Sequence, residues 1–388
     1  MKLADYIRGD RVIWMVIILL SVISLLSVYS SSQSLAFSGG ANKTVYLLLK
    51  QMFILVFGIF AIIVTHLLPY KIFSRLSQLL LFIVIPLLLF TLLFGRGNAE
   101  ANRWLEMPGG FTFQTSDMAK IILVIFVARV LSLKQSKLKK FKEAFGPIIF
   151  ASALVCGLIL PANFSTAALL FITVFILMFI GRMPLKFLFL TLAGAVVFFA
   201  LFILALETFD LQSRQGTWKS RIESFRKGPG EGVNNYQVNR AKVAIVNGGI
   251  FGKGPGNSVQ KEKLPQANSD FIYAIIIEEY GLAGGLIVMF LYIWLLFRTA
   301  LIVRKSKRTF PAFAAIGLVL LIVLQAILNM AVAVNLVPVT GQTLPYISSG
   351  GSSVLFTSLA LGVILSISWG IEEDLNKSQK LNIENEED

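Results

Sequence analysis

Long apolar segments alternate with short polar connections along almost the whole chain. A helix that crosses the hydrocarbon core of a bilayer needs about 20 mostly apolar residues. Ten segments approach or reach this length, and the fifth is short because Pro161 follows it. They are residues 12–31, 45–68, 72–94, 118–133, 147–160, 165–181, 185–207, 271–297, 311–336 and 352–369. The pattern predicts an all-α polytopic membrane protein with about ten transmembrane helices, the first of which is an anchor and not a cleaved signal peptide.

Composition and charge support this interpretation and orient the chain. Hydrophobic residues make up 56% of the sequence and charged residues 14%, which excludes an ordinary soluble domain. Basic residues concentrate in one alternating set of connections, at Lys134, Lys137, Lys139, Lys140, Lys142, Arg182, Lys186, Arg298, Arg304, Lys305, Lys307 and Arg308. The opposite set has little beyond Lys43, Arg96 and Arg103. By the positive-inside rule both termini are expected in the cytoplasm. The net charge of +14 then reflects topology and contact with membrane lipids, and nucleic acid is not an expected partner.

The connections divide one membrane domain, residues 1–388, into recognisable parts. Residues 208–270 form a large extracytoplasmic loop between the seventh and eighth spans, and residues 371–388 form an acidic cytoplasmic tail that is expected to be disordered. Within the loop, residues 236–246 predict an amphipathic helix on the membrane face. Residues 248–256 contain five glycines, which indicate either a bend back to the membrane or a backbone nest for a phosphate. The turn propensity of glycine and proline favours the bend.

The rare residues exclude several kinds of chemistry. Cys156 is the only cysteine, which excludes an intramolecular disulfide, and His66 is the only histidine, so a histidine triad and a two-histidine metal site are unsupported. Acid or base chemistry must therefore come from carboxylates.

Four acids lie around the start of the eighth span. Asp270 stands at its outer mouth, where an aspartate is more often a helix cap than a catalyst. Glu262 precedes it in the loop, and Glu278 and Glu279 lie about 12 Å deeper along the helix. Because charges at that depth are costly, the two deeper acids should face the protein interior or a wet cavity and be paired.

The fourth span and the loop before it supply the candidate cations. Asp117 and Lys120 are three residues apart, which places acid and amine on one helix face. A snorkelling lysine with a capping Ser116 is an equally good interpretation of the sequence. Arg103 suits a pyrophosphate, and Trp104 beside it suits the lipid interface.

Three motifs, in this order, resemble the SEDS family of FtsW, RodA and SpoVE. They are Arg103-Trp104 with residues 113–120 (FQTSDMAK), residues 268–271 (NSDF), and residues 341–353 (GQTLPYISSGGSS). The likeness covers nearly the whole chain. The family's usual fourth-span motif is Gln-Pro-Ser-Glu, so Thr115 and Asp117 depart from it.

The resemblance implies a peptidoglycan glycosyltransferase that polymerises lipid II together with a class B penicillin-binding protein. It implies that Asp270 is the essential exterior acid, Glu262 a second acid, and Asp117 with Lys120 the charged pair. Their chemistry and position add Arg103, Trp104 and Glu279 as further substrate-binding candidates. The second and third motifs look more like FtsW than RodA, which implies the division septum of the bacterial inner membrane and other divisome membrane proteins as partners. No protein metal site is predicted, and the one cofactor candidate is a divalent cation, Mg²⁺ or Mn²⁺, on the pyrophosphate.

Two other functions fit parts of the pattern. A flippase for lipid II would also need buried charges, but along the full depth of the membrane. A membrane scaffold for division proteins would need neither Asp270 nor Lys120.

Overall fold

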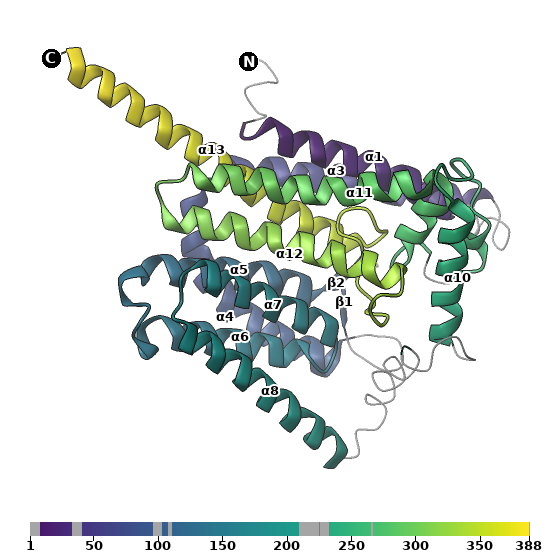
Figure 1. Ribbon diagram of the computed structural model, residues 1–388, viewed down its shortest axis with the longest axis horizontal. Helices are drawn as coiled ribbons and strands as arrows, with labels where there is room; N and C mark the ends of the chain where they lie inside the picture. The colour runs from purple at the N-terminus through teal and green to yellow at the C-terminus, as the bar shows by residue number, and fades with distance from the viewer. Residues whose placement is uncertain are drawn as a thin grey trace.

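The computed structural model is a bundle of long helices with one small hairpin (Figure 1). It describes residues 8–32, 41–95, 103–107, 111–208, 225, 233–264 and 267–387. The longer helices are α1 (Arg11–Ser32), α3 (Ala41–Leu67), α4 (Tyr70–Phe94), α5 (Thr115–Leu133), α6 (Gly146–Ile159), α7 (Phe164–Ile180), α8 (Leu185–Thr208), α10 (Val233–Gly248), α11 (Ile272–Arg304), α12 (Thr309–Ala333) and α13 (Gly351–Glu387). Short helical turns occupy Gln135–Lys137, Phe141–Phe145 and Gln260–Glu262.

Each of the ten predicted apolar segments coincides with one of these helices. Among the described helices, seven are long and apolar enough to cross a membrane. Helix α7 and the Leu185–Phe198 part of α8 are shorter apolar segments. Helix α5 also carries Asp117, Lys120 and Arg129 among its apolar residues. The chain is therefore a helical membrane protein, and the number of ten crossings stays a prediction.

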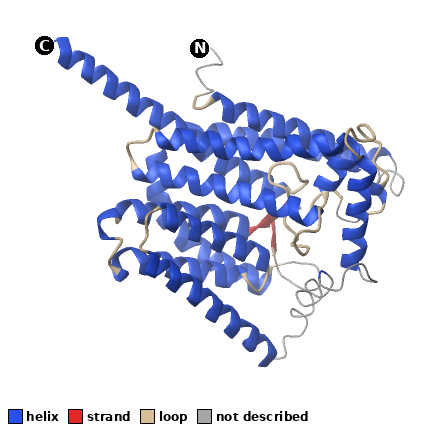
Figure 2. Cartoon of the chain, in the orientation of Figure 1, coloured by secondary structure: helices blue, strands red, loops and turns tan. Residues whose placement is uncertain are grey.

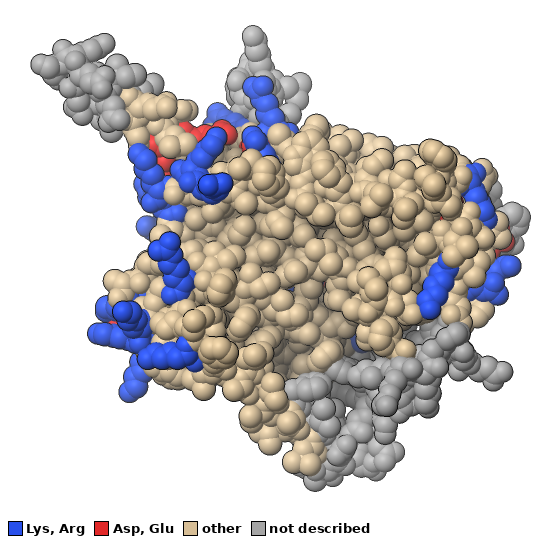
Figure 3. Space-filling model, in the orientation of Figure 1, with Lys and Arg blue, Asp and Glu red and all other residues tan. Residues whose placement is uncertain are grey.

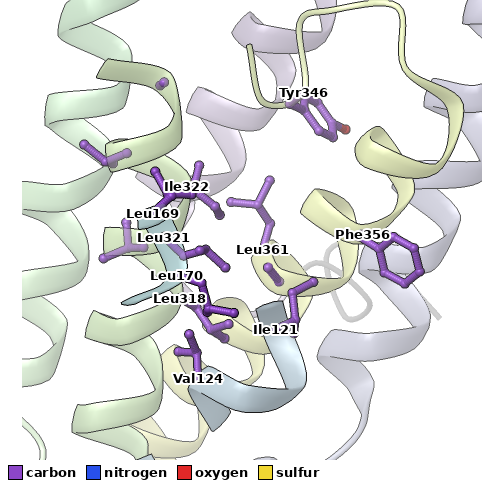
Figure 4. Close-up of a cluster of buried hydrophobic side chains, with 14 of the residues drawn as sticks. Ile121, Val124, Leu169, Leu170, Leu318, Leu321, Ile322, Tyr346, Phe356 and Leu361 are labelled. Carbon is purple, nitrogen blue, oxygen red and sulfur yellow. The ribbon is translucent and has the colours of Figure 1, made fainter. Parts of the chain in front are cut away.

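Helix α12 lies at the centre of the bundle. It packs against α5, α7, α11 and α13. Figure 4 shows part of the resulting core, in which Leu318 and Ile322 of α12 meet Val124 of α5, Leu170 of α7 and Leu361 of α13. Large apolar side chains that remain exposed, such as Phe82, Phe150 and Phe189, lie on α4, α6 and α8, as expected of helices whose solvent is lipid.

The hairpin precedes α5. Strands β1 (Trp104–Met107) and β2 (Phe111–Gln114) are antiparallel, and Trp104 pairs with Gln114 (Figure 2). The main-chain N–H of Gln114 donates to Ser352 Oγ at the start of α13 over 3.3 Å. The hairpin therefore brings the start of α5 next to the start of α13.

Basic side chains gather at one end of the bundle (Figure 3). They belong to the α5–α6 and α11–α12 connections, and α1 begins and α13 ends at this same end (Figure 1). Here Lys134 and Lys137 pair with Glu143 at 2.9 and 3.3 Å, and Arg308 pairs with Asp374 of α13 at 3.0 Å. Helix α13 continues through the predicted polar tail as far as Glu387, and the division of the chain into domain, loop and tail stays a prediction.

The opposite end carries α10 and the glycine run. The predicted helix of residues 236–246 lies within α10, which packs on α11. Helix α11 bends at Gly281, whose φ is 71°, and a Cβ there would lie 2.1 Å from the carbonyl oxygen of Ile250. A Cβ on Gly252 would likewise lie 2.2 Å from the carbonyl oxygen of Glu279. The glycines thus let the exterior backbone pack directly onto the bend of α11.

Candidate functional site

An ion pair is buried at the outer end of α5. Lys120 Nζ lies 2.9 Å from Asp117 Oδ1, and only 6% and 7% of the two side chains are exposed. The predicted sharing of one helix face is therefore observed, and Lys120 does not snorkel. Ser116 Oγ accepts a hydrogen bond from the side chain of Gln114, and the cap position of α5 is Gln114 itself.

Two amide side chains of α12 belong to the same polar region, and neither was predicted from the sequence. Lys120 Nζ donates to Gln325 Oε1 over 3.0 Å, and Gln325 Nε2 donates to the carbonyl oxygen of Thr343 over 3.0 Å. Asn329 lies four residues further along α12, on the same face. Polar amides four residues apart in an otherwise apolar span were a usable signal, because such groups need partners in the membrane.

Asp270 is half-buried and immediately precedes α11. Its main-chain carbonyl accepts a 2.9 Å hydrogen bond from Asn329 Nδ2. The residue at the cap position of α11 is Phe271, which forms no side-chain cap. The Asp270 segment is thus attached to the same face of α12 that binds Lys120.

The connection between α12 and α13, residues 334–350, is non-helical and largely buried. Helices of the bundle supply donors to its carbonyls: Asn329 to Gln342, Gln325 to Thr343, Tyr292 to Pro345 and Ser24 to Ile347. Non-helical backbone is tolerated at membrane depth only where its polar groups are hydrogen-bonded in this way. The predicted third motif therefore forms a fixed wall of the site.

Arg103 is linked to the α12–α13 connection through residues 162 and 163. Its Nε donates to the carbonyl oxygen of Ala162 over 2.5 Å. The next residue, Asn163, caps α7 and accepts a 3.4 Å hydrogen bond from Gln342 Nε2. Arg103 also lines a small cavity with Thr115 and Asn163. Trp104, in β1, is half-buried.

The two deeper acids are buried and bonded, as the sequence analysis expected. Glu278 is 0% exposed and accepts hydrogen bonds from the hydroxyl of Ser258 and from the main-chain N–H groups of Val259 and Gln260 at 3.2 and 3.1 Å. Lys253 Nζ lies 3.3 Å from the same carboxylate. Glu278 therefore binds residues 253–260 from inside the bundle.

Glu279 and Glu262 differ in their surroundings. Glu279 is 1% exposed and accepts a hydrogen bond from Ser30 of α1, which places it away from the Lys120 face. Glu262 is exposed in the short turn that Glu278 holds. The substrate-binding roles expected for both acids stay predictions.

The glycine run forms a bend on α11. The N–H groups of Lys253 and Gly254 donate to the carbonyl oxygens of Glu278 and Glu279 over 3.0 and 2.9 Å. Those N–H groups bind main-chain oxygens and are not directed at an outside anion. The bend interpretation is therefore confirmed.

The polar groups define a small cavity whose walls include Asp117, Lys120, Gln325, Ser353 and Thr357. Among the described residues, Asp117 Oδ2 lacks a hydrogen-bond partner, although it is buried. Within that part of the chain, no three His, Cys, Asp or Glu residues cluster closely enough to hold a metal ion.

Chemically, the candidate groups are the carboxylate of Asp270, the buried ammonium group of Lys120 and the guanidinium group of Arg103. Lys120 and the main chain of Asp270 bind α12, and Arg103 binds the carbonyl of Ala162. Such a set can accept a proton from a hydroxyl group and stabilise negative charge on a leaving group.

Known proteins share the fold and much of the sequence. A solved structure titled "Structural coordination of polymerization and crosslinking by a peptidoglycan synthase complex" superposes with a TM-score of 0.71 at 22% identity, covering 94% of this chain and 99% of the other. The RodA structure of Thermus thermophilus gives a TM-score of 0.67 at 22% identity, covering 94% and 98%.

Sequence relatives are closer. A probable peptidoglycan glycosyltransferase FtsW of Trichlorobacter lovleyi is 31% identical, covering 96% of this chain and 95% of its own. Stage V sporulation protein E of Bacillus subtilis is 30% identical, covering 92% and 96%. A family model for FtsW, RodA and SpoVE, described as "Cell cycle protein", matches residues 10–372. The family model matches most of the chain and the relatives are matched over nearly their whole length, so the chain belongs to the FtsW/RodA/SpoVE family.

Proposed function

We propose that the chain is a peptidoglycan glycosyltransferase that polymerises lipid II, a disaccharide carried on a polyprenyl pyrophosphate. Membership of the family and the names of the FtsW relatives support the reaction class. The observation that carries the proposal is the attachment of two segments to one face of α12. Gln325 binds Lys120, and Asn329 binds the main chain of Asp270.

In the proposed reaction, the 4-hydroxyl oxygen of the acceptor sugar attacks the anomeric carbon of the donor. A new carbon–oxygen bond forms as the bond to the pyrophosphate breaks, with inversion from α to β. The hydroxyl proton passes to the carboxylate of Asp270, and the lipid pyrophosphate leaves with the bonding electrons. General base catalysis of this kind contributes about a hundredfold to ten-thousandfold.

The cations serve the leaving group in this proposal. Lys120 is buried beside Asp117, so a pyrophosphate that reaches it meets an ammonium group in a weakly screened environment. Arg103 adds a guanidinium group, and Trp104, Asp117, Glu262 and Glu279 complete the proposed substrate-binding set. Mg²⁺ or Mn²⁺, if bound with the pyrophosphate, would offset its negative charge.

The cellular setting follows from the same family membership. We propose that the protein lies in the bacterial inner membrane with both termini in the cytoplasm, and that it acts at the division septum. A class B penicillin-binding protein is the proposed partner that cross-links the new strand, alongside other divisome membrane proteins. The likeness to a chain of a solved peptidoglycan synthase complex supports such a partner.

The experiment is polymerisation of purified lipid II by this protein with its cognate class B partner, comparing the wild type with Asp270→Asn. We expect long glycan strands from the wild type and none from the variant, with equal folding by size-exclusion chromatography. An active Asp270→Asn variant would remove Asp270 as the base. If neither protein makes product and lipid II crosses vesicle membranes instead, the protein is a flippase.

A further inference from the structure

Asn329 joins two parts of the candidate site that are far apart in the sequence. Its side chain is 1% exposed, and its Nδ2 donates to the carbonyl oxygen of Asp270 over 2.9 Å and to that of Gln342 over 2.7 Å. An amide NH₂ group has two N–H bonds, so both are used. A single side chain therefore fixes Asp270 against the α12–α13 connection.

The connection holds the same segment from its other side. Ser348 Oγ donates to the carbonyl oxygen of Ser269 over 2.7 Å, and the N–H of Ser349 donates to that of Asn268 over 2.9 Å. Three consecutive carbonyls, at residues 268–270, thus accept hydrogen bonds from α12 and the connection that follows it. The main-chain position of Asp270 is in this way set by the bundle.

Lys120 is hydrogen-bonded to the same helix, through Gln325. Gln325 and Asn329 are four residues apart, which separates them by about 6 Å along the axis of α12. In Figure 1, α12 lies between α11, which follows Asp270, and α5, which carries Lys120. The two amides on one helix therefore hold the ammonium group of Lys120 and the main chain of Asp270 in a fixed relation.

We propose that Asn329 is a positioning residue for catalysis: it holds Asp270 by its main-chain carbonyl at the distance from Lys120 that the transfer reaction needs. The inference rests on the proposed function of Asp270 as the base. A displacement of about 1 Å at a reacting group can cost about a hundredfold in rate, so loss of this hydrogen bond acts on turnover although Asn329 need not touch substrate.

The test separates positioning from plain stability. Kinetics of lipid II polymerisation are measured for the full chain with its class B partner, for wild type, Asn329→Ala and Ser348→Ala. Thr299→Val is the matched control, because Thr299 is equally buried but donates only within its own helix, to the carbonyl oxygen of Leu295. A second readout is the rate at which a maleimide labels Ser269→Cys in a Cys156→Ala background, which otherwise contains no cysteine.

We expect Asn329→Ala to lower kcat about tenfold to a hundredfold while KM changes less than about twofold. Labelling of Cys at position 269 should become faster, because the segment is no longer held. Ser348→Ala should shift both quantities in the same direction by less, and it carries the test if Asn329→Ala does not fold. Thr299→Val should match the wild type in both.

Two results would overturn the inference. One is wild-type kcat and labelling in both Asn329→Ala and Ser348→Ala; the other is a lower kcat with unchanged labelling, which indicates a general loss of active protein. Asp270→Asn in the same assay tests the proposed function separately. If Asp270→Asn is inactive while Asn329→Ala behaves as wild type, only the positioning role fails.

Discussion

Lys120 and Asp117 form a 2.9 Å ion pair whose two side chains are at least nine-tenths buried. The two opposite charges compensate each other inside the bundle, and Gln325 accepts a further hydrogen bond from the ammonium group. Removal of one member would leave the other charged and unpaired in a medium of low dielectric constant. Each member therefore needs the other for stability, in addition to the role of Lys120 in the proposed binding of pyrophosphate.

Single and paired substitutions separate these two roles. Lys120→Met should destabilise the protein by about 3–5 kcal/mol, because Asp117 is left as an uncompensated buried charge. The double variant Lys120→Met with Asp117→Leu should recover most of the stability and none of the polymerisation activity. Thermal unfolding in detergent and the lipid II assay measure the two effects. Recovery of activity in the double variant would show that the ammonium group does not act on substrate.

A second prediction concerns the carboxylate that binds the exterior loop. Glu278→Gln should weaken the hydrogen bonds from Ser258, Val259 and Gln260. Because a hydrogen bond to a charged group contributes about 1.5–3 kcal/mol, amide hydrogen exchange at residues 259 and 260 should accelerate at least about tenfold. The matched variant is Glu262→Gln, in which the changed side chain is exposed on the same turn. Equal exchange in the two variants would contradict the role given to Glu278.

Hydrophobic length predicted the positions of ten helices, and the spacing of Asp117 and Lys120 predicted that they share one helix face, with pairing and a snorkelling lysine equally open. The sequence did not indicate that α12 would connect them to Asp270. Lys120 and Gln325 are 205 residues apart, so no local periodicity relates them. Neutral amides also lack the charge that draws attention to a buried lysine. The two amides in an apolar span indicate that Gln325 and Asn329 have partners, but only tertiary packing shows that these partners are Lys120 and Asp270.

The buried carboxylates of Glu278 and Glu279 also show what the sequence could not predict. The cost of burying charge correctly predicted that Glu278 and Glu279 would find partners. It could not say which partners, and the structure gives them different ones: the exterior loop for Glu278 and Ser30 of α1 for Glu279. Local spacing alone had grouped the two acids together.

A third prediction tests the close packing at the bend of α11. Gly281→Ala should be strongly destabilising, because φ is 71° and the new Cβ would lie 2.1 Å from the carbonyl oxygen of Ile250. Gly194→Ala in α8 is the control, since no heavy atom lies within 4 Å of its added Cβ. We expect that control to be neutral or more stable by up to about 1 kcal/mol. Thermal unfolding of the two variants side by side measures the difference, and similar midpoints would contradict the steric argument.

The last prediction concerns the ion pair between Asp10, which precedes α1, and Arg298 of α11. Asp10 Oδ1 accepts hydrogen bonds from the N–H groups of Val12 and Ile13 at 3.0 and 3.1 Å, and its Oδ2 lies 2.6 Å from the guanidinium of Arg298. Asparagine can keep the cap and loses the charge, whereas alanine loses both. Asp10→Ala should therefore lower stability by about 1 kcal/mol more than Asp10→Asn, the typical contribution of a side-chain cap. The ion pair itself should contribute less than about 1 kcal/mol, because 36% of the Arg298 side chain is exposed. Thermal midpoints of the two variants, with Glu373→Gln as an exposed control, decide the order, and equal losses for Asn and Ala would assign the effect to the ion pair instead of the cap.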